Sequence, residues 1–438
     1  MRHRGLAAAV VSVVLATVGA IPATASAAPS RPPHLPCPLA AIPPPPPHPP
    51  RPVPAPRDPD RPTIGGEGLA TAGLVVPPAA PPPPGNLTAT SWLVADLDTG
   101  AVLGACGPHE QSPPASVLKL LLAAAVLPKL DPAQIAEVTA EDLNIERGSS
   151  AVGLVVGGRY PVETLWLGLL LQSGNDAANT LARLGGGAGG APAGLAGMNA
   201  YARELGAHDT HAATPSGLDG PGQFTSVYDL ALIARVCFAR DDFRRYATTL
   251  TAQMPAQPKG RAFQFQNENK LVTKYPGALG GKTGFTEMAR HTYVGAAERN
   301  GRRLVVTLLN AEALPVRAWQ QGAGLLDWGF ALPPDASVGR LVNPGEVTTP
   351  PTRAAEPSRT AERNAAPAGG GGGGSTEAAQ APADVARSAR WSPVTVGALV
   401  AVVVLFTASA MAAALRTRRG VRRRSGSGRR RLGGGAVW

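Results

Sequence analysis

Lysine is scarce in this chain of 438 residues: it supplies 6 of the 41 basic side chains, and arginine supplies the other 35. Arginine stays charged in proteins, whereas a lysine with a lowered pKa can lose its proton and act as a base. Two of the six lysines, Lys119 and Lys282, lie in short motifs with serine or threonine. This usage favours a role for these two positions that requires an amine.

Cysteine is also rare, and the three present are Cys37, Cys106 and Cys237. Because three is odd, at most one disulfide can form within the chain and one thiol is left over. Export would allow a bridge between Cys106 and Cys237, but the spacing does not establish it. Cysteine spacing therefore does not define the fold.

The central region lacks an excess of positive charge, although the whole chain has a formal net charge of +11. Residues 86–330 contain 20 Lys and Arg against 21 Asp and Glu, which leaves a net charge of −1. The excess lies in the linkers and in residues 416–438, which have nine arginines and no acidic residue. An arginine run beside an apolar segment usually sets the orientation of a membrane span and contacts anionic lipids. Nucleic acid is therefore not an expected partner.

Both ends of the chain carry targeting signals. Residues 1–27 combine early basic residues, an apolar run from Leu6 to Ile21 and a small-residue site at Ala25 to Ala27, which predicts a cleaved signal peptide. An uncleaved anchor is the alternative, but the run is short for a bilayer span. Residues 394–415 carry no charge and predict a transmembrane helix. The arginine-rich tail 416–438 then lies in the cytoplasm and everything before residue 394 outside it.

Two low-complexity segments flank the central region. Residues 28–85 hold 23 of the 46 prolines and predict a disordered spacer in an extended polyproline II conformation. A proline-rich binding ligand is the alternative. Residues 331–393 are rich in Ala, Pro and Gly, with an unbroken run from Gly369 to Gly374, and predict a flexible linker. One compact domain of residues 86–330 remains between them.

This domain has strand patterns at both ends and helical patterns between them. Hairpins are predicted around Asp98 to Gly100 and around Asn300-Gly301. Helices are predicted from Pro161 to Leu171, from Asp176 to Leu184, and after a capping box that begins at Ser226. The glycine-rich stretch 185–197 lacks the features of a phosphate-binding loop and is interpreted as a surface loop. The expected fold class is α+β, with a helical lobe inserted into an antiparallel sheet.

Three motifs fall in order along the domain: Ser116 to Lys119, Ser173 to Asn175, and Lys282 to Gly284. Ser116 and Ser173 are 57 residues apart, and Ser173 and Lys282 are 109 residues apart, so the three motifs fit within one domain. A serine hydroxyl is a weak nucleophile until a base removes its proton, and a buried lysine near another cation can be that base. The first motif lies at the start of an apolar helix, where positions three apart share a face.

Each motif alone also fits an ordinary capped helix, turn or edge strand. The functional prediction therefore depends on all three motifs together.

Other candidate catalytic or metal sites have less support in the sequence. His208 and His211 have no third metal ligand motif beside them, and no Gly-x-Ser-x-Gly elbow surrounds a serine. We expect serine acyl transfer without metal or cofactor.

Together the motifs resemble those of penicillin-binding proteins and serine β-lactamases. The neighbouring sequence is similar to that of low-molecular-mass D-alanyl-D-alanine carboxypeptidases. The matching stretches are Pro114 to Ser116, Leu170 to Asn179, Thr214 to Leu218, Gly280 to Thr286 and Leu325 to Phe330. The resemblance implies an α/β/α sandwich with a five-stranded antiparallel sheet, a penicillin-sensitive enzyme, and peptidoglycan stem peptides as substrate.

The resemblance also implies the role of each site residue. Ser116 would form the acyl-enzyme, Lys119 would take its proton and Ser173 would relay a proton to the leaving D-alanine. The substrate would be held by the remaining set: Asn175, Lys282, Thr283, Gly284, Phe285 and Arg317. The backbone N–H groups of Ser116 and Phe285 would form the oxyanion hole.

Three other activities use the same acyl step. A β-lactamase is disfavoured because no Glu-x-x-x-Asn follows Asn175 near residues 208–214. A β-lactam-sensing receptor is disfavoured because the tail 416–438 is too short for an effector domain. A muropeptide D,D-endopeptidase, which cuts a cross-link instead of a free stem end, remains open.

Overall fold

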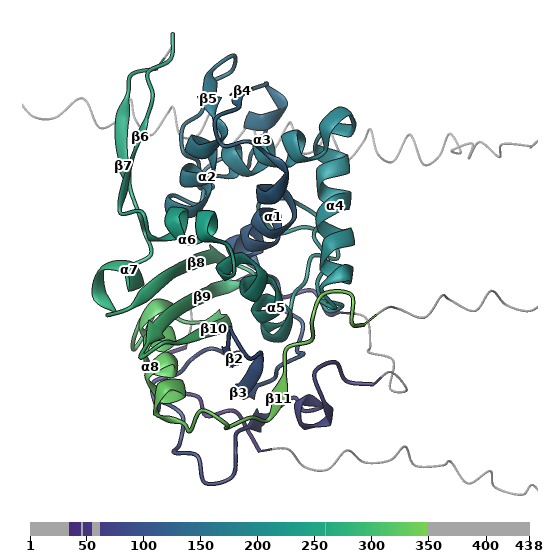
Figure 1. Ribbon diagram of the computed structural model, residues 1–438, viewed down its shortest axis with the longest axis vertical. Helices are drawn as coiled ribbons and strands as arrows, with labels where there is room; N and C mark the ends of the chain where they lie inside the picture. Colours follow the sequence, from purple (N-terminus) through teal and green to yellow (C-terminus); the bar gives the residue numbers. More distant parts are fainter. Residues whose placement is uncertain (1–34, 45–46, 55–61, 259, 348–438) are drawn as a thin grey trace, which may run out of the picture. The chain divides into compact units, whose positions relative to one another are not determined.

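The computed structural model describes residues 35–44, 47–54, 62–258 and 260–347 (Figure 1). The predicted signal peptide, most of the predicted linker, the predicted membrane span 394–415 and the tail 416–438 lie outside these residues. Within the described residues, no helix is both long and apolar enough to span a bilayer.

An antiparallel sheet forms the centre of the domain. Its five long strands have the spatial order β3-β2-β10-β9-β8, so the predicted five-stranded sheet built from both ends of the domain is confirmed. Two further strands of two residues each, β1 and β11, pair with the outer edge of β3. The strands are β1 Leu74–Val75, β2 Ser91–Asp96, β3 Ala101–Cys106, β8 Ala278–Thr286, β9 Arg290–Arg299, β10 Arg302–Ala311 and β11 Gly339–Arg340.

Alternation along the strands builds a core on each face of the sheet. In β2, Leu93 and Ala95 belong to the core on the side of the helical lobe, whereas Trp92 and Val94 belong to the core beneath α8. Successive side chains of a strand point to opposite faces, so this pattern places helices on both sides. Both predicted hairpins are present: β2 joins β3 around Asp98 to Gly100, and β9 joins β10 at Asn300-Gly301.

Helices form the two outer layers, which confirms the α/β/α arrangement (Figure 1). Helix α8 packs on one face of the sheet, and α5 lies against β2 and β10 on the other, with the helical lobe beyond it. The α-helices are α1 Lys119–Val126, α2 Val162–Leu171, α3 Asn175–Gly185, α4 Gly190–Glu204, α5 Val227–Phe238, α6 Asp241–Thr248, α7 Leu271–Lys274 and α8 Ala318–Ala331. Two small hairpins, β4–β5 (Ile135–Glu137, Arg159–Pro161) and β6–β7 (Thr251–Met254, Phe263–Gln266), complete the elements. The Ser226 side chain caps α5, as predicted, by accepting a hydrogen bond from the Asp229 N–H.

The prediction of a surface loop at residues 185–197 was wrong. This stretch forms a short 3-10 turn and the first half of α4, which packs against α3. A Cβ atom added at Gly194 would lie 2.0 Å from the carbonyl oxygen of Ala182. The glycine therefore serves close helix packing, which outweighs its low helix propensity.

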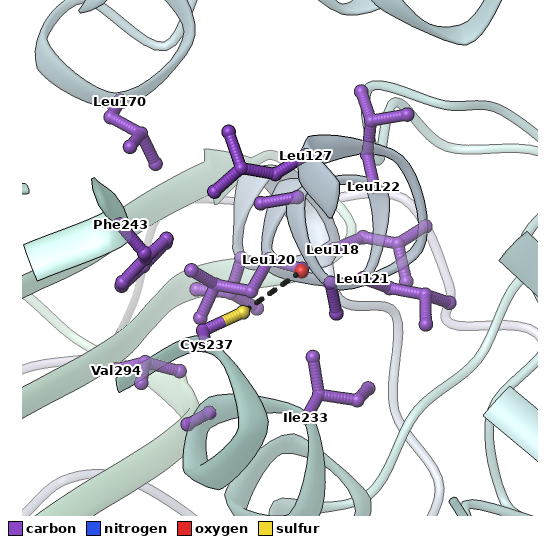
Figure 2. Packing of buried hydrophobic residues seen from close by; sticks show 14 of the residues in the cluster. Leu118, Leu120, Leu121, Leu122, Leu127, Leu170, Ile233, Cys237, Phe243 and Val294 are labelled. Atoms are coloured by element: carbon purple, nitrogen blue, oxygen red, sulfur yellow. Dashed lines mark hydrogen bonds between the residues drawn. The ribbon is translucent and has the colours of Figure 1, made fainter. Parts of the chain in front are cut away.

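The cysteines pair differently from the bridge that export would allow between Cys106 and Cys237. Cys106 forms a disulfide with Cys37, and Cys237 is the free cysteine among the described residues. Cys237 lies in the core around α1, where its thiol donates to the Leu120 carbonyl at 3.3 Å (Figure 2). Cys106 belongs to the core on the opposite face of the sheet, so it does not reach Cys237.

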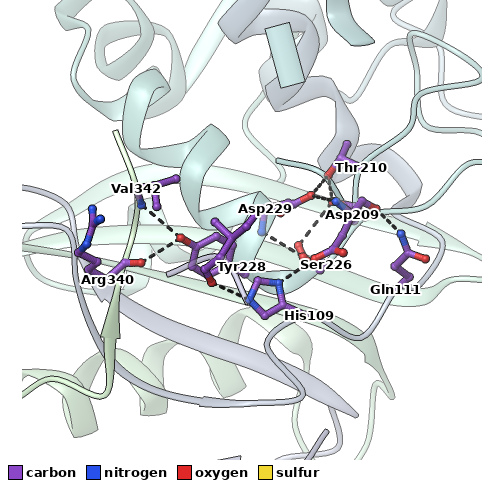
Figure 3. Close-up of polar contacts among 11 residues, drawn as sticks. His109, Gln111, Asp209, Thr210, Ser226, Tyr228, Asp229, Arg340 and Val342 are labelled. Atoms are coloured by element: carbon purple, nitrogen blue, oxygen red, sulfur yellow. Dashed lines mark hydrogen bonds and ion pairs between the residues drawn. The ribbon is translucent and has the colours of Figure 1, made fainter. Parts of the chain in front are cut away.

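The domain is longer at both ends than residues 86–330. Leu69 is fully buried, and Leu341 and Val342 are also in the core, so segments predicted as spacer and linker pack onto the sheet. The Tyr228 hydroxyl donates to the Arg340 carbonyl at 2.9 Å and accepts from the Val342 N–H (Figure 3). These contacts are between residues distant in sequence, and composition alone does not reveal them.

Candidate active site

The three motifs meet where the helical lobe contacts β8. Ser116 lies in a 3-10 turn, Ala115–Leu118, that leads directly into α1. Ser173 lies between α2 and α3, Asn175 opens α3, and Lys282 to Gly284 lie in β8. The sheet and the lobe each supply part of the site.

The amine of Lys119 lies at the centre of this site. Its Nζ is 2.8 Å from Ser116 Oγ, 2.7 Å from Asn175 Oδ1 and 2.7 Å from the carbonyl oxygen of Ser216. A protonated amine donates to all three. A neutral amine donates to the amide and the carbonyl, and its lone pair then accepts from the Ser116 hydroxyl. This geometry can remove the serine proton.

The surroundings favour the neutral form of Lys119. Its side chain is fully buried, and this desolvation is the main reason that its pKa lies well below the ordinary value for lysine. The positive charge of Lys282 lowers the pKa further, while the negative charge of Asp176 opposes the shift. Burial and a second cation are both among the causes expected from the sequence.

Lys282 is also buried, at 2% exposed, and its Nζ donates to the Thr283 carbonyl at 2.8 Å. Burial lowers its pKa to about 8, and the charge of Glu268 partly opposes this shift. The side chain therefore carries its charge at neutral pH and can bind an anion there.

Strand β8 lies very close to the turn that holds Ser116. A Cβ atom added at Gly284 would be 2.8 Å from the Ser116 nitrogen and 2.3 Å from Thr292 Oγ1. The Thr292 hydroxyl in turn donates to the Pro114 carbonyl at 2.8 Å. A glycine at position 284 is thus required for this close approach.

Two site residues have left-handed backbone conformations that are uncommon for residues other than glycine. Ala115, directly before Ser116, has φ of 49°, and Ser173 has φ of 61°. Such conformations cost about 1–3 kcal/mol each and cluster at functional sites. The strained positions are thus the residue directly before Ser116 and the second serine of the site, Ser173.

A cleft of about 1260 Å³ opens over Ser116. Arg317 precedes α8 at its rim and is exposed, and the ring of Phe285, 51% exposed, lies beside His291 with a centroid distance of 4.7 Å. The predicted site residues that line the cleft are Ser116, Ser173, Asn175, Thr283, Gly284, Phe285 and Arg317. The structure therefore brings the whole predicted set together, with the two lysines buried beneath the cleft.

Sequence reasoning missed two supports of this site. The Ser216 carbonyl contacts the Lys119 amine, and in the sequence only the family resemblance of Thr214 to Leu218 points to this stretch. Asp176 is 1% exposed, and its carboxylate accepts N–H bonds from Val152, Gly153 and Leu154. In the sequence, Asp176 is marked by its place directly after Ser173 to Asn175, at the start of a predicted helix and within the family-like stretch Leu170 to Asn179.

Comparison with known proteins agrees with this geometry. The sequence profile of the D-alanyl-D-alanine carboxypeptidase family matches residues 77–313, more than half of the chain. The chain is 44% identical over 271 residues to D-alanyl-D-alanine carboxypeptidase DacB2 of Mycobacterium tuberculosis, an alignment that covers 61% of this chain and 90% of the relative. It is 35% identical over 263 residues to DacD of Salmonella typhimurium, covering 57% of this chain and 64% of the relative.

Solved structures show the same likeness. A D-alanyl-D-alanine carboxypeptidase from Mycobacterium tuberculosis matches with a TM-score of 0.57 and 44% identity, over 61% of this chain and all of that chain. A DD-transpeptidase from Streptomyces matches with a TM-score of 0.54 and 26% identity, over 58% of this chain and all of that chain. The fold and the site thus define a penicillin-binding-protein-like serine peptidase. The chain belongs to the D-alanyl-D-alanine carboxypeptidase family.

Proposed function

We propose that this chain is a serine-type D-alanyl-D-alanine carboxypeptidase that removes the terminal D-alanine from peptidoglycan stem peptides. Ser116 Oγ attacks the carbonyl carbon of the penultimate D-alanine while the neutral Lys119 amine takes the hydroxyl proton. The tetrahedral intermediate then expels the terminal D-alanine, whose nitrogen takes a proton relayed through Ser173. The product is an acyl-enzyme on Ser116.

The other site residues hold the substrate in this proposal. The amide of Asn175 holds the peptide, and the terminal carboxylate lies against Lys282, Thr283 and Arg317. The N–H groups of Ser116 and Phe285 face the oxyanion, where fixed donors stabilise developing charge. Gly284 lets β8 approach the turn that carries Ser116, which brings Thr283 and Phe285 beside the reactive serine.

Water completes the cycle by hydrolysing the acyl-enzyme. Lys119 is neutral again once its proton has reached the leaving nitrogen through Ser173, so it takes a proton from the attacking water and returns it to Ser116 Oγ as the ester bond breaks. A β-lactam mimics the peptide bond, acylates Ser116 in the same way and is released slowly. Covalent labelling by penicillin therefore reports the first half of the reaction.

The contact of the Lys119 amine with Ser116, Asn175 and Ser216 is the observation that carries this proposal. The test is mass spectrometry of the products that the mature chain forms from pentapeptide, together with labelling by fluorescent penicillin. We expect release of D-alanine and a label at Ser116, both lost in Ser116→Ala. Full release of D-alanine by Ser116→Ala would show that another residue is the nucleophile.

We also propose that residues 1–27 direct export, that residues 394–415 anchor the chain, and that the tail 416–438 is cytoplasmic. The disulfide between Cys37 and Cys106 supports an oxidising compartment for the catalytic domain. Protease added outside intact protoplasts is expected to remove the catalytic region. Complete protection of that region would contradict this topology.

A further inference from the structure

A proline-rich segment, residues 47–54, lies at one end of the active-site cleft and has no role in the chemistry above. We call it the proline strap. Pro49 is one of the residues that line the cleft, together with Ala313, Arg317 and Ala318. The strap is otherwise largely exposed, with Val53 at 91%, so it lies on the surface of the domain without forming part of its core.

The chain before the strap is fixed to the sheet. The disulfide joins Cys37 to Cys106 at the end of β3. The Ala40 N–H donates to the Leu87 carbonyl at 2.7 Å, and the Leu74 N–H donates to the Leu35 carbonyl at 2.8 Å. These links limit how far the strap can move from the domain.

The strap itself contacts the end of β10, the strand that precedes α8. With the Asn310 amide oriented so that its oxygen faces donors, that oxygen accepts from the Arg51 guanidinium at 2.9 and 3.2 Å. The pKa of Glu312 is lowered chiefly by its hydrogen bond with Arg290, and the charge of His48 contributes as well. Arg51 therefore lies beside Asn310, and Pro49 lines the same cleft as Ala313, just before Arg317.

This is the end of the cleft where the proposed function puts the terminal carboxylate of the substrate. When a free stem peptide is cleaved, the leaving group at this end of the cleft is a single D-alanine. A cross-linked substrate would leave a second stem peptide at the same place, and its bulk would meet Pro49 and the backbone beside it. Excluding the larger leaving group requires only a fixed obstacle, because no favourable contact compensates for the clash.

We propose that the proline strap closes the leaving-group end of the cleft and makes the enzyme select free stem ends over cross-links. The inference rests on the proposed function, since it uses the carboxylate position assigned there. It makes the strap a specificity-determining segment that takes no part in acylation. The disulfide and Arg51 hold it in place.

The test compares two substrates with the full mature chain: a pentapeptide that ends in D-Ala-D-Ala, and a cross-linked muropeptide dimer that lacks a free D-Ala-D-Ala end. Cys37→Ser and Arg51→Ala each loosen the strap at a different point. We expect the ratio of cross-link cleavage to D-alanine release to rise about tenfold in each variant, the size of effect that one removed steric contact has on specificity. Release of D-alanine from the pentapeptide stays near the wild-type rate.

Arg261→Ala is the matched control, because Arg261 is an exposed arginine outside the cleft, and its ratio should not change. Should Cys37→Ser fail to fold, as shown by its melting curve, Arg51→Ala decides alone. An unchanged ratio in a folded variant overturns the role of the strap while leaving the carboxypeptidase intact. A wild-type enzyme that releases no D-alanine overturns the proposed function instead, so the two failures are distinct.

Discussion

Replacing Lys282 by arginine is expected to remove the loss of activity at high pH. In the proposed mechanism, Lys282 must be charged to bind the substrate carboxylate, and burial lowers its pKa to about 8. Above that pH the wild-type amine loses its charge, so kcat/KM, which reports the free enzyme, should fall. Arginine stays charged throughout this range.

The size of the effect follows from this pKa. At pH 10 the wild-type Lys282 is charged in about 1% of molecules, so its kcat/KM should lie about 100-fold below the maximum. In Lys282→Arg the value should stay level over the same range. Its maximum is expected to be lower than in wild type, because a bulkier side chain must fit a site that is only 2% exposed.

The rising limb of the profile should be similar in both enzymes. It reflects deprotonation of Lys119, and a cation at position 282 continues to lower the pKa of that amine. The assay is D-alanine release from a short peptide ending in D-Ala-D-Ala, measured between about pH 5 and 11 with each enzyme first checked for folding at the extremes.

Lys129→Arg is the matched control for this experiment, because Lys129 is exposed and does not line the cleft. It should keep the wild-type profile, including the fall above pH 8. A fall of equal size and midpoint in Lys282→Arg would refute the assignment of the high-pH limb to Lys282.

Three further changes test Lys119, Gly284 and the energetic cost of burying Lys282. Lys119→Arg keeps the charge but has no amine that can accept a proton, so penicillin labelling should fall at least about 100-fold, and normal labelling would exclude lysine as the base. Gly284→Ala places a methyl group against the Ser116 nitrogen and Thr292, so labelling should slow and the free energy of unfolding fall by about 1–3 kcal/mol, measured by urea denaturation. Lys282→Met removes a buried charge whose folded-state pKa, about 8, lies below the unfolded value. At pH 7 it should therefore stabilise the fold by up to about 3 kcal/mol, a gain that disappears as pH rises from 8 towards 10.5 because the unfolded lysine then loses its proton too. Equal stability of wild type and Lys282→Met at pH 7 would show that burying the charged Lys282 amine has no free-energy cost.

The sequence predicted those parts of the site that depend on residue type and short spacing. Ser116 and Lys119 lie one turn apart at the start of an apolar helix, so their contact is local. The hairpin at Asn300-Gly301 is equally local, because two residues define its turn. Lys282 was predicted from its motif, and its burial depends on the contacts that β8 makes with α6 and with the turn that holds Ser116.

The features that sequence reasoning missed depend on contacts between distant segments. Residues 185–197 were interpreted as a loop from their glycines, but packing against α3 decides their conformation. The partner of Cys106 depends on which face of the sheet each cysteine occupies. The Ser216 carbonyl contributes through its backbone, whose position no side-chain pattern reveals.

The contacts of Lys119 make its reactivity a property of the completed fold. Two of its three acceptors, Asn175 and Ser216, lie 56 and 97 residues further along the chain. Before those segments assemble, Lys119 is an ordinary exposed amine that is protonated at neutral pH, and Ser116 is an unreactive hydroxyl. An unfolded or partly folded chain therefore has no activated serine. It needs no inhibitory segment to keep it inactive. Penicillin labelling reports how much of a preparation has finished folding.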